Sequence, residues 1–204
     1  MFDDTLARQA ANAAEFDPAF ARVFGVATAP AGDNPLTLAL IDSPVGPLLA
    51  GATDHALRML EFTRPEGFDR QLQSIRRRHG SAARGSNPWI EQTRTQLAEY
   101  FAGQRRAFEL PLEYPGTAFQ QRVWSTLLTI PYGETWSYLD VAVRVGDPGA
   151  TRAVGTANGL NDIAIVIPCH RVINASGALG GYGGGSWRKR LLLDLERGQG
   201  ALAW

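Results

Sequence analysis

The spacing of hydrophobic residues changes along this chain, and the change limits the folds that the chain can adopt. Three short β-type runs come first, and turn-like clusters separate them; the runs are LTLALI, PLLAGA and ALRMLEF. After Thr117 the apolar residues recur at helical spacing instead. Strands and helices segregated in this way indicate an α+β protein, with a small antiparallel sheet and its helices in the first half and a mainly helical second half.

The same change divides the chain into three parts. Residues 1–33 are rich in alanine and show only a short helical pattern at 6–16, so we expect an arm or a peripheral helix there. Residues 34–112 are expected to form the sheet with two helices on it. The connector RRAFELPLEYPG then leads into a second domain, residues 113–204.

Start and stop signals place the helices of the sheet domain. A polar helix is expected from Phe68 to Arg78, and a loose loop, GSAARGSN, follows it. Asn87 is suited to cap the next helix, with Pro88 in its first turn and Gly103 just past its end.

Two capping boxes open the helices of the second domain. They are formed by Thr117 with Gln120 and by Ser137 with Asp140. The second of these helices and the next one are separated only by the Gly-Asp-Pro sequence at 146–148. This spacing is compatible with a helix-turn-helix, although any helical bundle contains such pairs.

Composition excludes several classes of protein. With 45% hydrophobic residues and 20 basic against 20 acidic side chains, the chain is neither disordered nor a coiled coil, and any contact with nucleic acid must be local. The longest apolar stretch, residues 163–168, is far short of the roughly 20 residues of a membrane span. The start, MFDDTLARQA, lacks the features of a signal peptide. We expect a cytoplasmic protein that does not contact membranes.

The chain has one cysteine, Cys169. With His55, His79 and His170 scattered along the sequence, it offers no metal-ligand spacing and no internal disulfide, so we expect no metal. A lone thiol is most often an inert, buried, small hydrophobe.

The surroundings of Cys169 favour a reactive thiol instead. The β-branched run 163–167 is apolar on both faces, which predicts a buried extended segment, and it leads into Pro168-Cys169-His170. An imidazole can accept a thiol proton directly or through a water. Because neighbouring side chains diverge in extended backbone, we expect a bridging water. The alternative for His170 is a core histidine bonded to a backbone carbonyl.

Two further features accompany this thiol. Glu196, in a helix expected to open at Ser186 and end before Gly198, is a candidate to orient the imidazole, or else a solvated acid at a helix end. The loop GALGGYGGGS around Tyr182 lacks the P-loop pattern. Its glycines either let the backbone approach a flat ligand or make tight turns.

Several of these segments together resemble the O6-alkylguanine-DNA alkyltransferases, which repair DNA by direct reversal. They are FQQRVWSTLLTIPYGETWSY, RAVGTA, NDIAIVIPCHRVI, GGYGGG and LLLDLE. PCHRV in that frame is highly specific, and the match runs from about Thr117 to Glu196. DSPVGPLLAGATDHALRMLEF is similar to the family's N-terminal domain, which implies a ribonuclease H-like fold there.

The resemblance implies a role for each matched residue. Cys169 takes the alkyl group, His170 is the water-linked base, and Glu196 orients that base. Asn161 forms a hydrogen bond near the thiol. Tyr138 meets the DNA phosphate at the flipped nucleotide and helps to protonate the departing base.

The resemblance also implies a DNA surface and a substrate pocket. Arg152 enters the base stack where the damaged guanine was, and the DNA-contacting residues are Tyr138, Arg152, Ala153 and Gly155. The pocket residues are Val172, Tyr182, Gly183 and Gly184. The family's helix-turn-helix lies in the minor groove, whose degenerate pattern suits a protein that inspects any sequence.

The implied reaction is irreversible and stoichiometric. The damaged nucleotide swings out of double-stranded DNA, and the thiolate takes its methyl or larger alkyl group as a thioether, so one molecule repairs one lesion. No cofactor is needed, and the protein is expected to act as a monomer. Whether O4-alkylthymine is accepted stays open.

This sequence departs from the family pattern at a few positions. Gly183 stands where many relatives have serine, which puts the preferred alkyl size in doubt, while Ser186 replaces an aliphatic residue and Asp162 a frequent proline. Two other functions agree less well with the sequence. A lesion sensor with an inert Cys169 is disfavoured because such relatives have another residue at that position, and a cysteine hydrolase because nothing suggests an acyl pocket.

Overall fold

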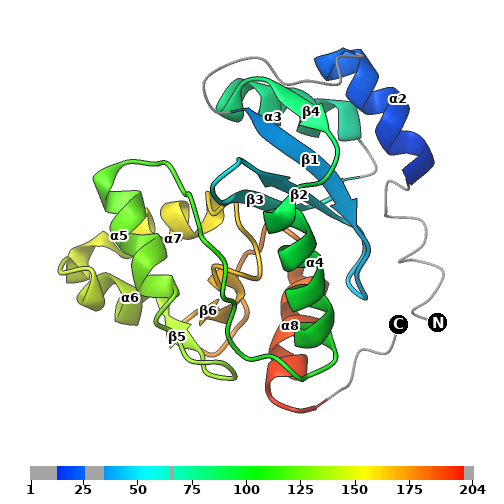
Figure 1. Cartoon of the computed structure of the whole chain (residues 1–204). Helices are drawn as coiled ribbons and strands as arrows, with labels where there is room; N and C mark the ends of the chain where they lie inside the picture. Colours follow the sequence, from blue (N-terminus) through cyan, green and yellow to red (C-terminus); the bar gives the residue numbers. More distant parts are fainter. Residues whose placement is uncertain (1–12, 26–34, 65–66, 200–204) are drawn as a thin grey trace. The chain divides into compact units, whose positions relative to one another are not determined.

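The computed structural model describes residues 13–25, 35–64 and 67–199, and its elements are labelled in Figure 1. They form two compact units. The first holds the residues up to 98 together with 109–113, and the second holds 99–108 and the residues from 114 onward. The α+β class is confirmed: the sheet lies in the first unit and the second is mainly helical.

The sheet has four strands in the order β3-β2-β1-β4. Strands β1 (Leu36–Ile41), β2 (Leu48–Ala52) and β3 (Leu57–Phe62) pair antiparallel, as predicted from the three runs. Strand β4 (Ala82–Arg84) pairs parallel to β1, in a segment expected to be loop. Three residues are too few to show an alternating pattern, so this strand depends on its pairing with β1.

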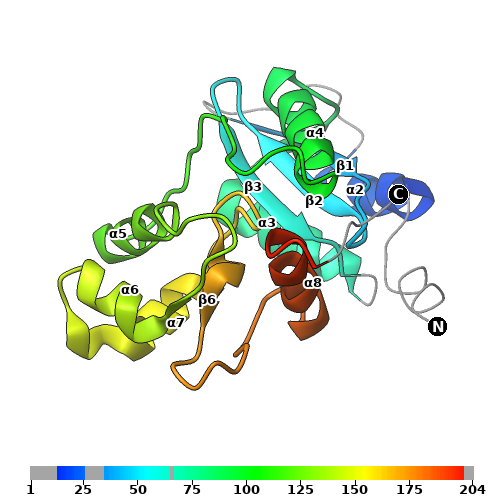
Figure 2. The ribbon, with the colours of Figure 1, turned by 90° about the horizontal axis from the view of Figure 1, so that it is seen from below.

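Helices cover the sheet on both faces. Figure 2 shows α3 (Phe68–His79) and α4 (Pro88–Phe101) on opposite sides of it. Every residue of β2 is buried, as expected for a central strand covered on both sides. A Cβ at Gly51 in this strand would lie 2.5 Å from Met59 Cγ, so only glycine fits there.

The capping residues expected for α4 are present. Asn87 Oδ1 accepts from the backbone N–H groups of Trp89 and Ile90, at 3.1 and 3.0 Å, and so caps α4. Gly103, just past the helix, has a φ of 73°, which glycine adopts without strain.

Helix α2 (Ala13–Phe24) belongs to the core of the first unit. Phe16, Phe20 and Val23 are buried in one cluster with residues of α3 and the sheet. The helix therefore continues well past residue 16, where the short helical pattern of the sequence ends. Most of that pattern, and residues 26–33, lie outside the described residues.

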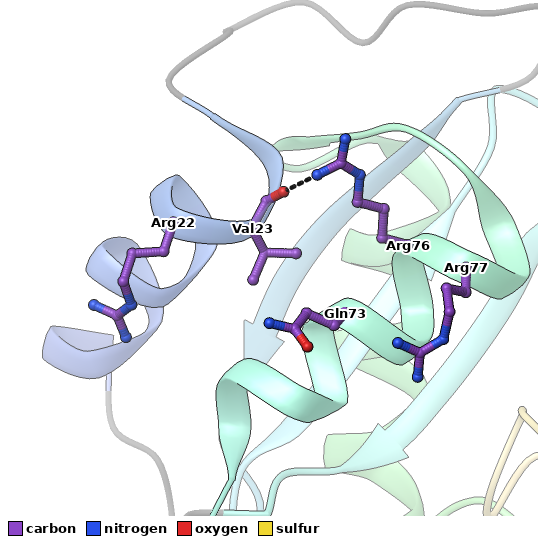
Figure 3. A pocket seen from close by; sticks show the side chains of 5 residues that line it. All are labelled: Arg22, Val23, Gln73, Arg76 and Arg77. Atoms are coloured by element: carbon purple, nitrogen blue, oxygen red, sulfur yellow. Dashed lines mark hydrogen bonds between the residues drawn. The ribbon is translucent and has the colours of Figure 1, made fainter.

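Arginines join α2 to α3. Arg76 Nη1 donates to the carbonyl of Val23 at 2.6 Å, and Arg22 pairs with Asp69 at 2.8 Å. The two helices line an open pocket of about 420 Å³. Its lining residues, shown in Figure 3, are Arg22, Val23, Gln73, Arg76 and Arg77. Two of its three arginines thus have partners that hold the helices together.

The second unit is mainly helical and contains the motifs that carry the family resemblance. Its elements are α5 (Ala118–Leu127), β5 (Trp136–Ser137), α6 (Tyr138–Arg144), η1 (Pro148–Ala150), α7 (Thr151–Gly159), η2 (Cys169–Arg171), β6 (Val172–Ile173) and α8 (Ser186–Glu196). Both predicted capping boxes are formed, at Thr117 and Ser137. Strands β5 and β6 pair in parallel.

Within residues 13–25, 35–64 and 67–199, no helix is long and apolar enough to cross a membrane. The same residues contain no group of three or more His, Cys, Asp or Glu side chains placed to hold a metal ion.

Candidate active site

The apolar run before the cysteine is buried, as predicted, but it is not extended. Ile167 N–H donates to the carbonyl of Ile163 at 3.0 Å, which closes a tight turn, and Ile165 has a φ of 70°. The side chain of Asn161 supports this turn: Oδ1 accepts from Ile163 N–H at 3.0 Å, and Nδ2 donates to the Ile167 carbonyl at 2.9 Å. Hydrophobic periodicity does not report such side-chain bonds, so the prediction of an extended segment was wrong.

Directly after this turn, Cys169 occupies the first position of a 3₁₀ helix, η2. The residue is 6% exposed, and Asn161 Nδ2 lies 3.1 Å from its Sγ. Burial raises the pKa of the Cys169 thiol, while the bond from Asn161 and the charge of Lys189 oppose that rise. The same asparagine therefore holds the turn and stabilises a thiolate.

His170 lies next to Cys169 and is completely buried. Its Nε2 is 2.9 Å from Glu196 Oε1, whereas its Nδ1 has no hydrogen-bond partner among the described residues. Burial lowers the pKa of His170, although Glu196 opposes this. A neutral ring that donates from Nε2 to Glu196 keeps a lone pair on Nδ1, which is the acceptor that a general base needs.

Glu196, at the end of α8, is buried beneath this histidine. Arg171 donates to both of its oxygens, at 2.8 and 2.9 Å, and Tyr100 Oη donates at 2.7 Å. The N–H of Gly133 adds a further bond at 3.1 Å. Burial alone would raise the pKa of Glu196, but hydrogen bonds and charges from His170 and Arg171 outweigh it and hold the pKa far below its usual range. Glu196 is a buried carboxylate rather than a solvated acid.

Sequence reasoning missed Arg171 and Tyr100 as parts of this network. Arg171 stands within the PCHR motif, where a basic residue is normally assumed to face solvent, yet it is 6% exposed. Tyr100 is 96 positions from Glu196 in the sequence. Only the folded chain brings their side chains together.

Lys189 is a third residue that the sequence did not single out. It is fully buried, and Nζ donates to the carbonyls of Val172 and Gly181, at 2.6 and 3.4 Å, and also to that of Leu179. Burial lowers its pKa to about 8, against the opposing effect of Cys169. Lys189 ties β6 to the glycine-rich loop and places a positive charge near the thiol.

Tyr138 lies close to two glycines of this unit. A Cβ at Gly155 would lie 3.9 Å from its ring, and a Cβ at Gly180 would lie 3.4 Å from its hydroxyl. Burial raises the pKa of Tyr138, and the nearby Cys169 raises it further. The structure therefore brings Tyr138, α7 and the glycine-rich loop together near the thiol.

The residues expected to form the substrate pocket differ in burial. Val172 is completely buried and Gly184 is buried, whereas Gly183 is exposed. The ring of Tyr182 meets that of His170 edge to face, with centroids 6.5 Å apart. Burial raises the pKa of Tyr182 well above its usual value.

Two of the three expected DNA-contacting residues of α7 are exposed, and the third, Gly155, is half-buried. Arg152 and Ala153 are exposed, and no side chain of a described residue pairs with the Arg152 guanidinium. The two helices α6 and α7 are joined through Gly146, whose φ is 86°, and through the short η1. This guanidinium is free to contact a ligand.

Two family models match the chain. They are described as "6-O-methylguanine DNA methyltransferase, ribonuclease-like domain", over residues 36–114, and "6-O-methylguanine DNA methyltransferase, DNA binding domain", over residues 118–198. The ribonuclease-like fold expected for the first domain is thereby confirmed.

Individual relatives agree with these matches. The methylated-DNA–protein-cysteine methyltransferase of Mycobacterium tuberculosis is 51% identical over 160 residues, which are 77% of this chain and 90% of that protein. The constitutive protein of the same name from Bacillus subtilis is 41% identical over 157 residues, which are 76% of this chain and 92% of that protein. The crystal structure of Mycobacterium tuberculosis OGT in complex with DNA is 46% identical with a TM-score of 0.67, over 78% of this chain and 92% of that one.

Proposed function

This chain belongs to the 6-O-methylguanine DNA methyltransferase family, and on that premise we propose that Cys169 is the residue that receives the alkyl group. The protein is a methylated-DNA–protein-cysteine methyltransferase and repairs DNA by direct reversal of alkylation. Cys169 is the only cysteine in the chain. The observation that carries the assignment is its thiol, bonded to Asn161 at 3.1 Å and followed by the buried His170–Glu196 pair.

The side chains suggest how the thiol is activated. The unpaired Nδ1 of His170 is the acceptor for the thiol proton, through one water, while Glu196 holds the ring by Nε2. The negative charge of Glu196 stabilises the imidazolium that results. The amide of Asn161 and the ammonium of Lys189 stabilise the thiolate.

The transfer step forms one bond and breaks another. Sγ of Cys169 attacks the alkyl carbon, a thioether forms, and the bond from that carbon to guanine O6 breaks. The departing guanine takes a proton, which we assign to the hydroxyl of Tyr138. Nothing in this site can cleave a thioether, so each molecule reacts once.

The lesion must leave the base stack before the thiol can reach it. We propose that α6 and α7 act as a helix-turn-helix in the minor groove, with Arg152, Ala153 and Gly155 at the DNA. Arg152 would fill the space of the extruded nucleotide and offset part of the unstacking cost, which is about a few kcal/mol. The protein would act as a monomer in the cytoplasm, where the thiol stays reduced.

One experiment separates this function from its alternatives. The protein is mixed with duplex DNA containing O6-methylguanine, and the Cys169 peptide is analysed by mass spectrometry. Gain of one methylene unit supports transfer. Tight binding without a mass change would indicate a lesion sensor, and turnover of esters would indicate a hydrolase.

A further inference from the structure

Asn158, in α7, has a buried side chain with one unpaired polar atom. The residue is 6% exposed, and its Nδ2 donates to the main-chain carbonyl of Cys169 at 3.4 Å. Its Oδ1 is buried and has no hydrogen-bond partner among the described residues. Neither the motifs nor the reaction steps above use this side chain.

An unpaired buried acceptor needs an explanation. It destabilises the folded protein, because it has lost its hydrogen bonds to water and gained none. A leucine of similar size would fill the same space without that loss. The bond from Nδ2 to the Cys169 carbonyl determines which end of the amide faces that carbonyl, and it leaves Oδ1 as the unpaired end. A donor that arrives with the substrate would satisfy it.

The chemistry of the lesion identifies that donor. Alkylation at O6 removes the proton from guanine N1, so N1, N3, N7 and O6 are all acceptors. The exocyclic 2-amino group is then the only donor on the base. We propose that Oδ1 of Asn158 accepts a hydrogen bond from the 2-amino group of the flipped O6-alkylguanine. This inference rests on the proposed function, since it takes that base to be bound beside Cys169.

Asn158 would therefore help to determine specificity. A site built to bind a substrate N–H rejects an analogue that lacks it, because the protein acceptor stays unpaired. O6-Methylhypoxanthine is O6-methylguanine without the 2-amino group. We expect the wild-type protein to repair O6-methylguanine about tenfold to a hundredfold faster.

The test compares these two bases in otherwise identical single-stranded oligonucleotides, so that base pairing does not contribute. Single-turnover rate constants are measured with protein in excess, for the wild type and for Asn158→Leu and Asn158→Ala. Loss of the acceptor should slow only the reaction of O6-methylguanine, so the ratio of the two rates should fall by about tenfold. A role limited to positioning the Cys169 peptide through Nδ2 would slow both reactions equally.

Two results would overturn the inference. One is a wild-type ratio near one, which needs no variant to fold; the other is an unchanged ratio in a variant whose thermal unfolding shows that it is folded. Failure of the wild-type protein to methylate Cys169 from either base would instead contradict the proposed function.

Discussion

Glu196 Oε1 lies 2.9 Å from His170 Nε2, and both side chains are completely removed from solvent. Arg171 is bonded to the same carboxylate, so one buried anion faces a buried cation and a neutral imidazole. Such an arrangement is favourable only while all of its members remain, because a buried charge that loses its partner keeps its full desolvation cost.

Replacing Glu196 by glutamine should therefore destabilise the protein. The change leaves Arg171 buried without its counter-charge, and we expect a loss of about 3–5 kcal/mol in the free energy of unfolding. Urea unfolding measures it. Glu134→Gln removes an exposed carboxylate of the same unit and should change stability by no more than about 0.5 kcal/mol. Equal, small effects of both substitutions would contradict the account of this network.

The low pKa of Glu196 predicts how stability depends on pH. The group is a carboxylate whose pKa is lower in the folded protein than in the unfolded chain, where it is about 4.3. Its contribution is present at neutral pH and is lost as pH falls below that unfolded value. Unfolding measured between about pH 6 and 3 should show a steeper loss for the wild type than for Glu196→Gln. Parallel curves would rule this contribution out.

Lys189→Met should shift the pH dependence of the transfer reaction. The positive charge of Lys189 lowers the pKa of Cys169, so its removal should move the rise in rate to higher pH. Reaction with free O6-benzylguanine reports this without DNA binding. Arg190→Met, an exposed neighbour, is the control. A variant that is slower at every pH with an unshifted profile would show that Lys189 only supports the glycine-rich loop.

Arg152→Ala should slow repair in duplex DNA far more than reaction with free O6-benzylguanine. The side chain is exposed on α7 and would act only where a nucleotide has to be extruded. The two rate constants, compared for wild type and variant, measure the difference. Equal losses on both substrates would remove its proposed role in flipping.

Much of the local structure could be predicted from the sequence. The three antiparallel strands, both capping boxes and the helix that carries Glu196 follow from patterns that span a few residues. Glu196 was a candidate partner of His170 from the sequence, with a solvated acid as the alternative, and the resemblance then implied that Glu196 orients the imidazole. No local pattern by itself links these two residues, which are 26 positions apart.

Other features depend on tertiary contacts and left no local signal. Strand β4 exists because it pairs with β1, and the turn at 163–167 is closed by the side chain of Asn161. Lys189 and Arg171 were not singled out in the sequence, because burial of a charge depends on partners that the sequence does not place nearby.

We propose that each protein molecule reacts once, when Cys169 takes an alkyl group from guanine O6 and becomes a thioether. A fixed amount of reduced protein is titrated with increasing duplex DNA containing O6-methylguanine, and both the repaired bases and the S-methylated Cys169 peptide are counted. Both should reach a plateau at one per protein molecule, and Cys169→Ala should repair none while still binding DNA. Repair that continues beyond one base per molecule, or that persists in Cys169→Ala, would contradict this proposal.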